Sequence, residues 1–136
     1  MLLRQARVVL SLAGGIAIAI TVSGCDTFDE AYLVVANDCA SEIVVSVPGA
    51  TSIEGVVVPP GRAWGALVDS PPIDPVRVWT ADGKISQVVD TAQWKADTNE
   101  LAIDVSREFC ASTKSQLVAV PRSSKEIDER YYDRID

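Results

Sequence analysis

Short runs of apolar, largely β-branched residues recur along this chain, and each run ends at a proline, a glycine or a polar turn sequence. Runs of this length and composition predict strands rather than helices. Two of them flank Asp82-Gly83, a pair typical of tight hairpins. The predicted strands cover residues 32–36, 42–47, 53–58, 62–68, 76–80, 85–89 and 101–105.

The residue pattern differs between these runs. Residues 32–36 are apolar throughout, which predicts a strand buried on both faces. Residues 42–47 and 101–105 alternate, as in strands with one face toward a core. We expect residues 32–36 and 42–47 to pair as an antiparallel hairpin with Cys39 in or beside its loop. A single sheet would leave one apolar face uncovered, so we predict an all-β domain, a small antiparallel β-sandwich of about seven strands and Ig-like.

Residues 111–136 depart from this pattern. Residues 117–120 could add an edge strand that Pro121 ends. Ser123 or Ser124 can cap a following helix, in which Ile127, Tyr131 and Ile135 recur at helical spacing. Two interpretations stay open for this polar C-terminal tail: it folds onto a partner or onto the sandwich, or it is a frayed, solvated terminus.

The first 24 residues have the layout of a secretory signal peptide. Arg4 and Arg7 make the start basic, and residues 8–22 are almost wholly apolar. This apolar stretch is shorter than the roughly 20 residues that a membrane-spanning helix needs. A signal peptide is therefore favoured over a transmembrane helix.

The end of this leader is more specific. Val22-Ser23-Gly24-Cys25 places an aliphatic residue and two small residues directly before a cysteine. The sequence resembles the lipobox of bacterial lipoproteins. That resemblance implies cleavage before Cys25, diacylglycerol on its sulfur and often further acylation, such as palmitate, on the new amine. It also implies a cell-membrane location on the extracytoplasmic face, and Asp26 resembles the inner-membrane retention signal of Gram-negative lipoproteins. The alternative is an ordinary secreted protein with a free or paired Cys25.

This leader divides the chain into four parts: a signal peptide (1–24), a short acidic tether (25–31), the β-sandwich domain (32–110) and the tail (111–136). With Cys25 acylated, Cys39 and Cys110 remain as an even pair in an oxidising compartment. We expect a disulfide between them, closing a loop of roughly 70 residues and worth about 4 kcal/mol. Two reduced, buried thiols are the alternative.

The net charge and the residue content limit the classes of function that the chain can have. Residues 25–136 hold 10 basic and 19 acidic residues, a net charge of −9, which argues against nucleic acid as a partner. The chain has no histidine, so Ser-His-Asp and Cys-His catalysis and the usual zinc sites are excluded. We expect no enzymatic activity, no cofactor and no metal. Two alternatives stay open: a small hydrolase that uses paired carboxylates, and a carrier of a lipid or other small ligand.

The expected function is therefore a membrane-anchored, non-catalytic binding or accessory module of the cell envelope, with an envelope protein as partner. Candidate partner contacts are Pro71 and Pro72 in the loop 69–75, Trp94 in a polar stretch, and Tyr131 in the tail. Each has an ordinary structural interpretation as well, since prolines end strands and a loop tryptophan often closes the end of a sandwich.

Overall fold

The structure is a computed structural model, and it describes residues 30–112 and 115–135. The predicted signal peptide, the lipobox and all but the last two residues of the acidic tether lie outside the described residues. Within them, the chain forms eight strands, two α-helices and a short 3-10 helix. In chain order these are β1 (Glu30–Asn37), β2 (Ile43–Ser46), β3 (Val56–Val58), β4 (Ala63–Asp69), β5 (Arg77–Thr80), β6 (Ser86–Val88), β7 (Glu100–Val105), α1 (Arg107–Ala111), β8 (Val120–Pro121), α2 (Ser124–Tyr131) and η2 (Tyr132–Arg134).

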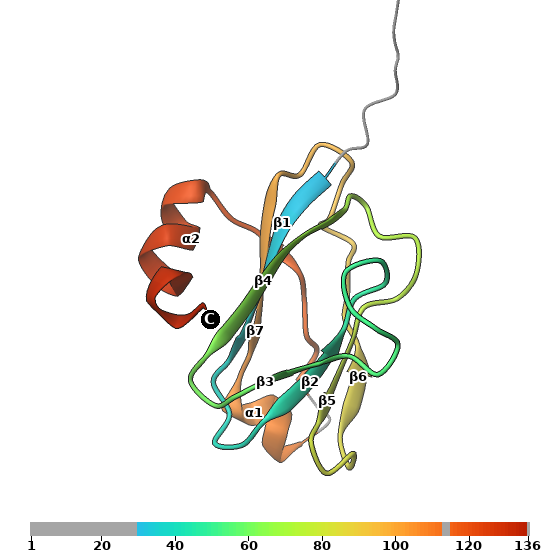
Figure 1. Ribbon diagram of the computed structural model, residues 1–136, viewed down its shortest axis with the longest axis vertical. Coiled ribbons are helices and arrows are strands. Elements are labelled where there is room, and N and C mark those ends of the chain that lie inside the picture. The colour runs from blue at the N-terminus through green and yellow to red at the C-terminus, as the bar shows by residue number, and fades with distance from the viewer. Residues whose placement is uncertain (1–29, 113–114, 136) are drawn as a thin grey trace, which may run out of the picture.

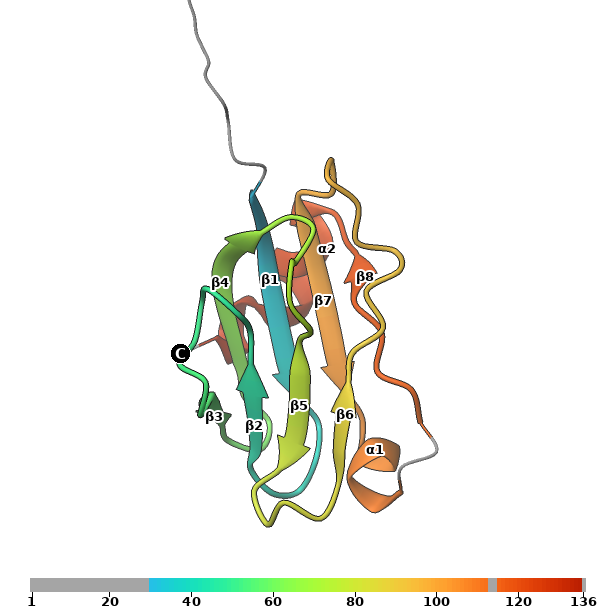
Figure 2. The same cartoon turned by 90° about the vertical axis from the view of Figure 1, so that its right-hand side faces the viewer.

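The described strands form two sheets that pack face to face (Figures 1 and 2). Sheet A has the order β4-β1-β7-β8, and sheet B has the order β3-β2-β5-β6. The prediction of a mostly β domain with two packed sheets is confirmed. The hairpin predicted around Asp82-Gly83 is also confirmed, since β5 and β6 pair antiparallel on either side of it.

The core lies between the two sheets and is built by alternate residues of the strands. Leu33 and Val35 of β1 face it from sheet A. So do Leu101, Ile103 and Val105, the alternating apolar residues of β7. Ile43 and Val45 of β2 face it from sheet B. These side chains are buried completely, so the period-two patterns did identify which faces of these strands are buried.

The hairpin predicted from residues 32–36 and 42–47 is wrong. Strand β1 pairs with β4 and β7 in sheet A, and β2 pairs with β3 and β5 in sheet B. The turn between them, which contains Cys39, carries the chain from one sheet to the other. The reason lies in the residue patterns: β1 is apolar on both sides and needs a doubly covered sheet, whereas β2 alternates and suits a sheet with one exposed face.

The prediction of a purely antiparallel sandwich is also wrong, because β1 and β7 pair in parallel, with Leu33 opposite Leu101. Strand β1 starts at one end of the sandwich, which we call the tether end. Strand β6 runs toward this same end, where the loop of residues 89–99 crosses to sheet A, and β7 then runs back alongside β1 (Figure 2). Two strands that start at one end and lie side by side can only be parallel.

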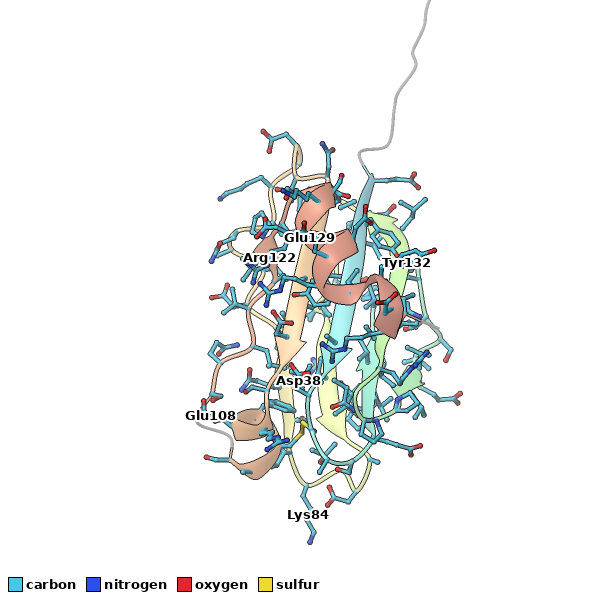
Figure 3. The ribbon with its side chains drawn as sticks, turned by 90° about the vertical axis from the view of Figure 1, so that its left-hand side faces the viewer. Asp38, Lys84, Glu108, Arg122, Glu129 and Tyr132 are labelled. Atoms are coloured by element: carbon cyan, nitrogen blue, oxygen red, sulfur yellow. A yellow bond between two sulfur atoms is a disulfide. The ribbon has the colours of Figure 1, made fainter. Side chains whose placement is uncertain are left out.

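Helix α2 makes a third layer on the outer face of sheet A (Figures 1 and 3). Ile127 and Tyr131 of the helix pack against Val34, Ala36 and Ala102 of the sheet. The helix begins after Ser123, which forms a capping box with Glu126, so the predicted cap is confirmed. The predicted helical spacing is confirmed for Ile127 and Tyr131, whereas Ile135 lies beyond both helices in extended backbone. A frayed, solvated terminus is contradicted for the described part of the tail.

The boundary predicted at residue 110 therefore does not end the domain. Beyond it, β8 extends sheet A, and Leu117 and Ala119 belong to the core between the sheets. The predicted edge strand is present but shorter and later than expected, since only Val120 and Pro121 pair with β7.

The predicted disulfide is present, and it joins Cys39, at the turn after β1, to Cys110 in α1. The two cysteines are 71 residues apart in the sequence. Cross-linking such distant positions restricts the unfolded chain far more than the folded one. The bond also fixes the end of the sandwich opposite the tether end, where α1 lies in Figure 2.

We predict that replacing both cysteines, Cys39→Ser with Cys110→Ser, lowers the free energy of unfolding by about 4 kcal/mol. Urea unfolding of the purified protein measures the change. Adding a reductant should destabilise the native protein to the same degree and leave the double variant unaffected. Equal stability of the oxidised native protein and the double variant would contradict the prediction.

Candidate functional site

The residues predicted as site residues lie in three places. Cys25 is outside the described residues, so its acylation stays a prediction. Cys39 and Cys110 are bonded to each other. Pro71 and Pro72 lie in the loop after β4, whose first residue, Ser70, is hydrogen-bonded to Trp94, and Tyr131 of α2 packs on the outer face of sheet A.

The loop of residues 70–75, which we call the proline loop, connects β4 to β5 across the tether end (Figure 1). Pro71 and Pro75 are exposed and Pro72 is half-buried, as expected for a surface loop. The Ser70–Pro71 peptide bond is cis. Most of the loop's side chains are therefore available to an outside partner, while its first residue, Ser70, is buried.

Ser70 anchors the proline loop to the neighbouring loop of residues 89–99. Its hydroxyl donates to the backbone carbonyl of Lys95 at 2.8 Å and accepts a hydrogen bond from the indole N–H of Trp94 at 2.9 Å. A second carbonyl, that of Thr98, lies 3.4 Å from the same hydroxyl. This buried polar group is fully paired, so the two loops are held as one unit.

The prediction of Trp94 as a surface contact is contradicted, because its side chain is only 2% exposed and belongs to the core between the sheets. The tryptophan closes the tether end of the sandwich and places its N–H against Ser70. Its neighbours in the sequence are polar because their side chains are exposed, while Trp94 itself has the ordinary structural role of a loop tryptophan at the end of a sandwich. Its contribution to the site is indirect, since it holds the proline loop in place.

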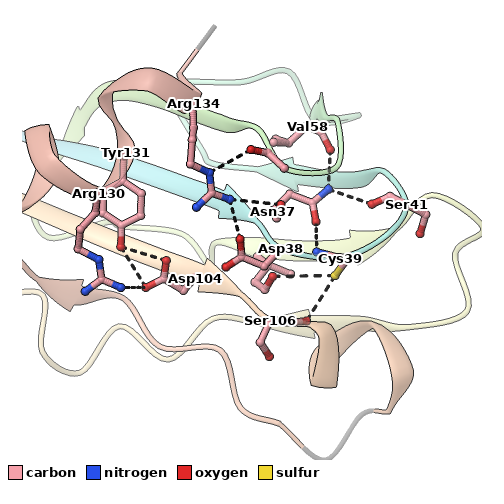
Figure 4. Close-up of polar contacts among 12 residues, drawn as sticks. Asn37, Asp38, Cys39, Ser41, Val58, Asp104, Ser106, Arg130, Tyr131 and Arg134 are labelled. Atoms are coloured by element: carbon pink, nitrogen blue, oxygen red, sulfur yellow. Dashed lines mark hydrogen bonds and ion pairs between the residues drawn. The ribbon is translucent and has the colours of Figure 1, made fainter.

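The prediction of Tyr131 as a partner contact is contradicted in the same way, since its side chain is 1% exposed. Its hydroxyl donates to the Asp104 carboxylate of β7, 3.0 Å from either oxygen (Figure 4). Arg122 and Arg130 lie 3.7 Å from the same carboxylate. Burial and the nearby Asp104 charge raise the pKa of the Tyr131 hydroxyl to about 12.

The end of the chain is fastened by Arg134. Its guanidinium donates to the backbone carbonyl of Gly61 at 3.0 Å and forms an ion pair with Asp38 at 2.7 Å (Figure 4). Close by, the Asn37 side chain donates to the carbonyls of Ser41 and Val58, each at 2.9 Å, and so ties β1 to sheet B. These contacts are structural, and they hold α2 and the turn after β1 in position.

Sequence reasoning missed the most exposed apolar side chain of the proline loop. Ile73 is 88% exposed, yet it is a large aliphatic residue flanked by prolines and aspartates. The neighbouring prolines indicate that this residue lies outside both sheets, but they do not indicate whether another part of the chain covers it. An apolar tip on an anchored loop is the feature that a membrane or a protein partner would contact.

The described residues show no pocket, and they contain no group of three or more acidic, cysteine or histidine side chains placed to hold a metal ion. In the same part of the chain, none of the helices is long and apolar enough to cross a membrane. Comparisons with protein-family models, with curated proteins and with solved structures found no match for this chain.

We predict that Trp94→Phe loosens the proline loop. The substitution keeps an aromatic ring but removes the hydrogen bond to Ser70, which costs about 1 kcal/mol of stability. Hydrogen exchange of the amides of residues 94 and 98, which donate to the Thr91 and Lys95 carbonyls beside Ser70, should become faster. The matched control is Trp79→Phe, a half-buried tryptophan of β5 outside the loop, which should leave these two amides unchanged. Identical exchange in both variants would contradict the anchoring role.

We predict that Tyr131 makes the domain less stable at alkaline pH. Its pKa is about 12 in the folded state and 10.0 in a model compound, so the folded state favours the neutral hydroxyl. This contribution is fully present below pH 10 and is lost as the pH rises toward 12. Tyr131→Phe should flatten this part of the curve of unfolding free energy against pH. Tyr132→Phe, at a 72% exposed position, is the control and should follow the native protein.

Proposed function

We propose that this protein is a bacterial lipoprotein in which Cys25 carries the lipid and the sandwich is a non-catalytic binding or accessory module of the cell envelope. The observation that carries this proposal is Val22-Ser23-Gly24-Cys25 at the end of a basic and then apolar leader. Two or more acyl chains hold a protein on a membrane far more firmly than one chain does. The mature protein would then act at the extracytoplasmic surface, on the inner membrane if the host is Gram-negative, as Asp26 implies.

The disulfide supports the compartment independently of the leader. Cys39 and Cys110 are bonded in the folded domain, and structural disulfides persist mainly in oxidising compartments outside the cytoplasm. Export through a cleaved leader brings a chain into such a compartment. The leader and the disulfide, at different places in the chain, therefore support the same location.

The finer comparison with Ig-like sandwiches also stays a proposal. It is supported by the chain's repeated crossing from one sheet to the other among the described strands. The parallel pair of β1 and β7 and the outer helix α2 are additions to that pattern.

The anchor is tested by expressing the full-length chain in a bacterial host with labelled palmitate and measuring the mass of the mature protein. We expect a mature chain that starts at Cys25, carries diacylglycerol and incorporates label. Cys25→Ser should abolish both the processing and the label. Cys39→Ser is the matched control, because it removes a cysteine but leaves the lipobox whole.

An unprocessed amino terminus, or a processed one with a free Cys25 thiol, would overturn the proposal.

Treating membranes from the same host with a cross-linker tests whether the protein binds an envelope protein. We expect the acylated native chain to be recovered with a defined envelope protein, and recovery of the chain alone would contradict an accessory role.

A further inference from the structure

The structure places several segments at the tether end, where β1 starts. Glu30 lies opposite Asp69 in the pairing of β1 with β4, so the proline loop begins beside the first described residue. The Tyr32 amide donates to the carbonyl of Asn99 at 2.8 Å, which puts the loop of residues 89–99 there as well. In Figure 1 the loop of residues 89–99 lies at the upper end of the molecule, where β1 begins, and the proline loop starts there and runs down one side to β5; Figure 2 agrees.

The sequence limits how far this end can be from a lipid on Cys25. Only residues 26–29 separate Cys25 from Glu30. Whatever conformation they take, the five steps from Cys25 to Glu30 span at most about 18 Å. The following step rests on the proposed function: with Cys25 acylated at the bilayer surface, the tether end stays within that distance of the lipid headgroups.

The proline loop is the part of this end that is built for contact. The aliphatic side chain of Ile73 is 88% exposed. Pro71, before it, and Pro75, after it, are exposed as well. Ser70 and Trp94 fix the base of the loop, so little conformational freedom is lost when its tip is buried. Burying an isoleucine side chain fully is worth roughly a tenfold change in an equilibrium or more.

We propose that the proline loop rests on the bilayer, with Ile73 in the interfacial region, and that this contact orients the sandwich with its disulfide end away from the membrane. The surrounding charges indicate which lipid suits it. Glu30, Asp69 and Asp74 are exposed at or beside the loop. Carboxylates are repelled by anionic headgroups, so the surface that fits is rich in zwitterionic lipid.

The test uses the acylated full-length protein in vesicles of phosphatidylethanolamine and phosphatidylcholine. Ile73→Cys introduces a thiol for an environment-sensitive fluorophore, while Cys25 carries lipid and the other two cysteines are bonded. The matched control is Ile53→Cys, since Ile53 is 90% exposed. It belongs to the loop between β2 and β3. In Figures 1 and 2 that loop lies about half way along the sandwich.

We expect spin-labelled lipids to quench the fluorophore at position 73 several-fold more than at position 53. Replacing part of the lipid with phosphatidylglycerol should reduce the difference. Equal quenching at the two positions, or none at position 73, overturns the proposal. Shielding of position 73 that occurs only in native membranes and not in pure lipid overturns it too, because the occupant is then a protein.

The mass of the protein in the same sample distinguishes failure of the bilayer contact from failure of the lipoprotein proposal on which it rests. Acyl chains on Cys25 without quenching at position 73 reject the bilayer contact and leave the lipoprotein assignment standing. A sample without acyl chains rejects both.

Discussion

Strand β1 carries apolar side chains on both of its faces, and neither face can be left in water. Leu33 and Val35 point toward sheet B, and Val34 and Ala36 point the other way, all of them buried completely. Each large aliphatic side chain among them gains about 1.5–3 kcal/mol from burial. The inner face is covered by sheet B, and the outer face is covered by α2. The three layers of the molecule follow from this one strand.

Helix α2 in turn depends on the sheet that it covers. A helix of eight residues is too short to be stable alone in water. Ile127 and Tyr131 are buried on the sheet, the Asp104 carboxylate is surrounded by Tyr131, Arg122 and Arg130, and the capping box closes the first turn. The free energy of these contacts offsets the cost of ordering the tail, so a terminus that is polar in sequence becomes part of the domain.

Much of this fold could be predicted from local pattern. Three features each depend only on neighbouring residues: the alternation in β7, the Asp82-Gly83 turn and the cap at Ser123. The disulfide was predictable because only two cysteines remain once Cys25 is assigned to the lipid. Which strands pair could not be predicted, because β1 pairs with β4, 27 to 39 positions away, and with β7, 68 positions away. The same holds for Trp94, whose polar N–H is satisfied by Ser70, and for Ile73, whose exposure depends on what the rest of the chain does not cover. At the candidate site the loop was predictable, but its anchor and its apolar tip were not.

Because α2 packs over β1, the fold can be completed only after most of the chain has been made. The first strand of the domain is completed by its last helix, and β7, which lies beside it, is also made late. A chain that has emerged from the ribosome only as far as residue 100 has an apolar strand with no partner on one edge and no cover on one face. Native structure must therefore wait until α2 has been made, and loss of α2 would expose the middle of sheet A. Because its contacts are so distant in sequence, we expect such a domain to fold slowly and mostly after synthesis.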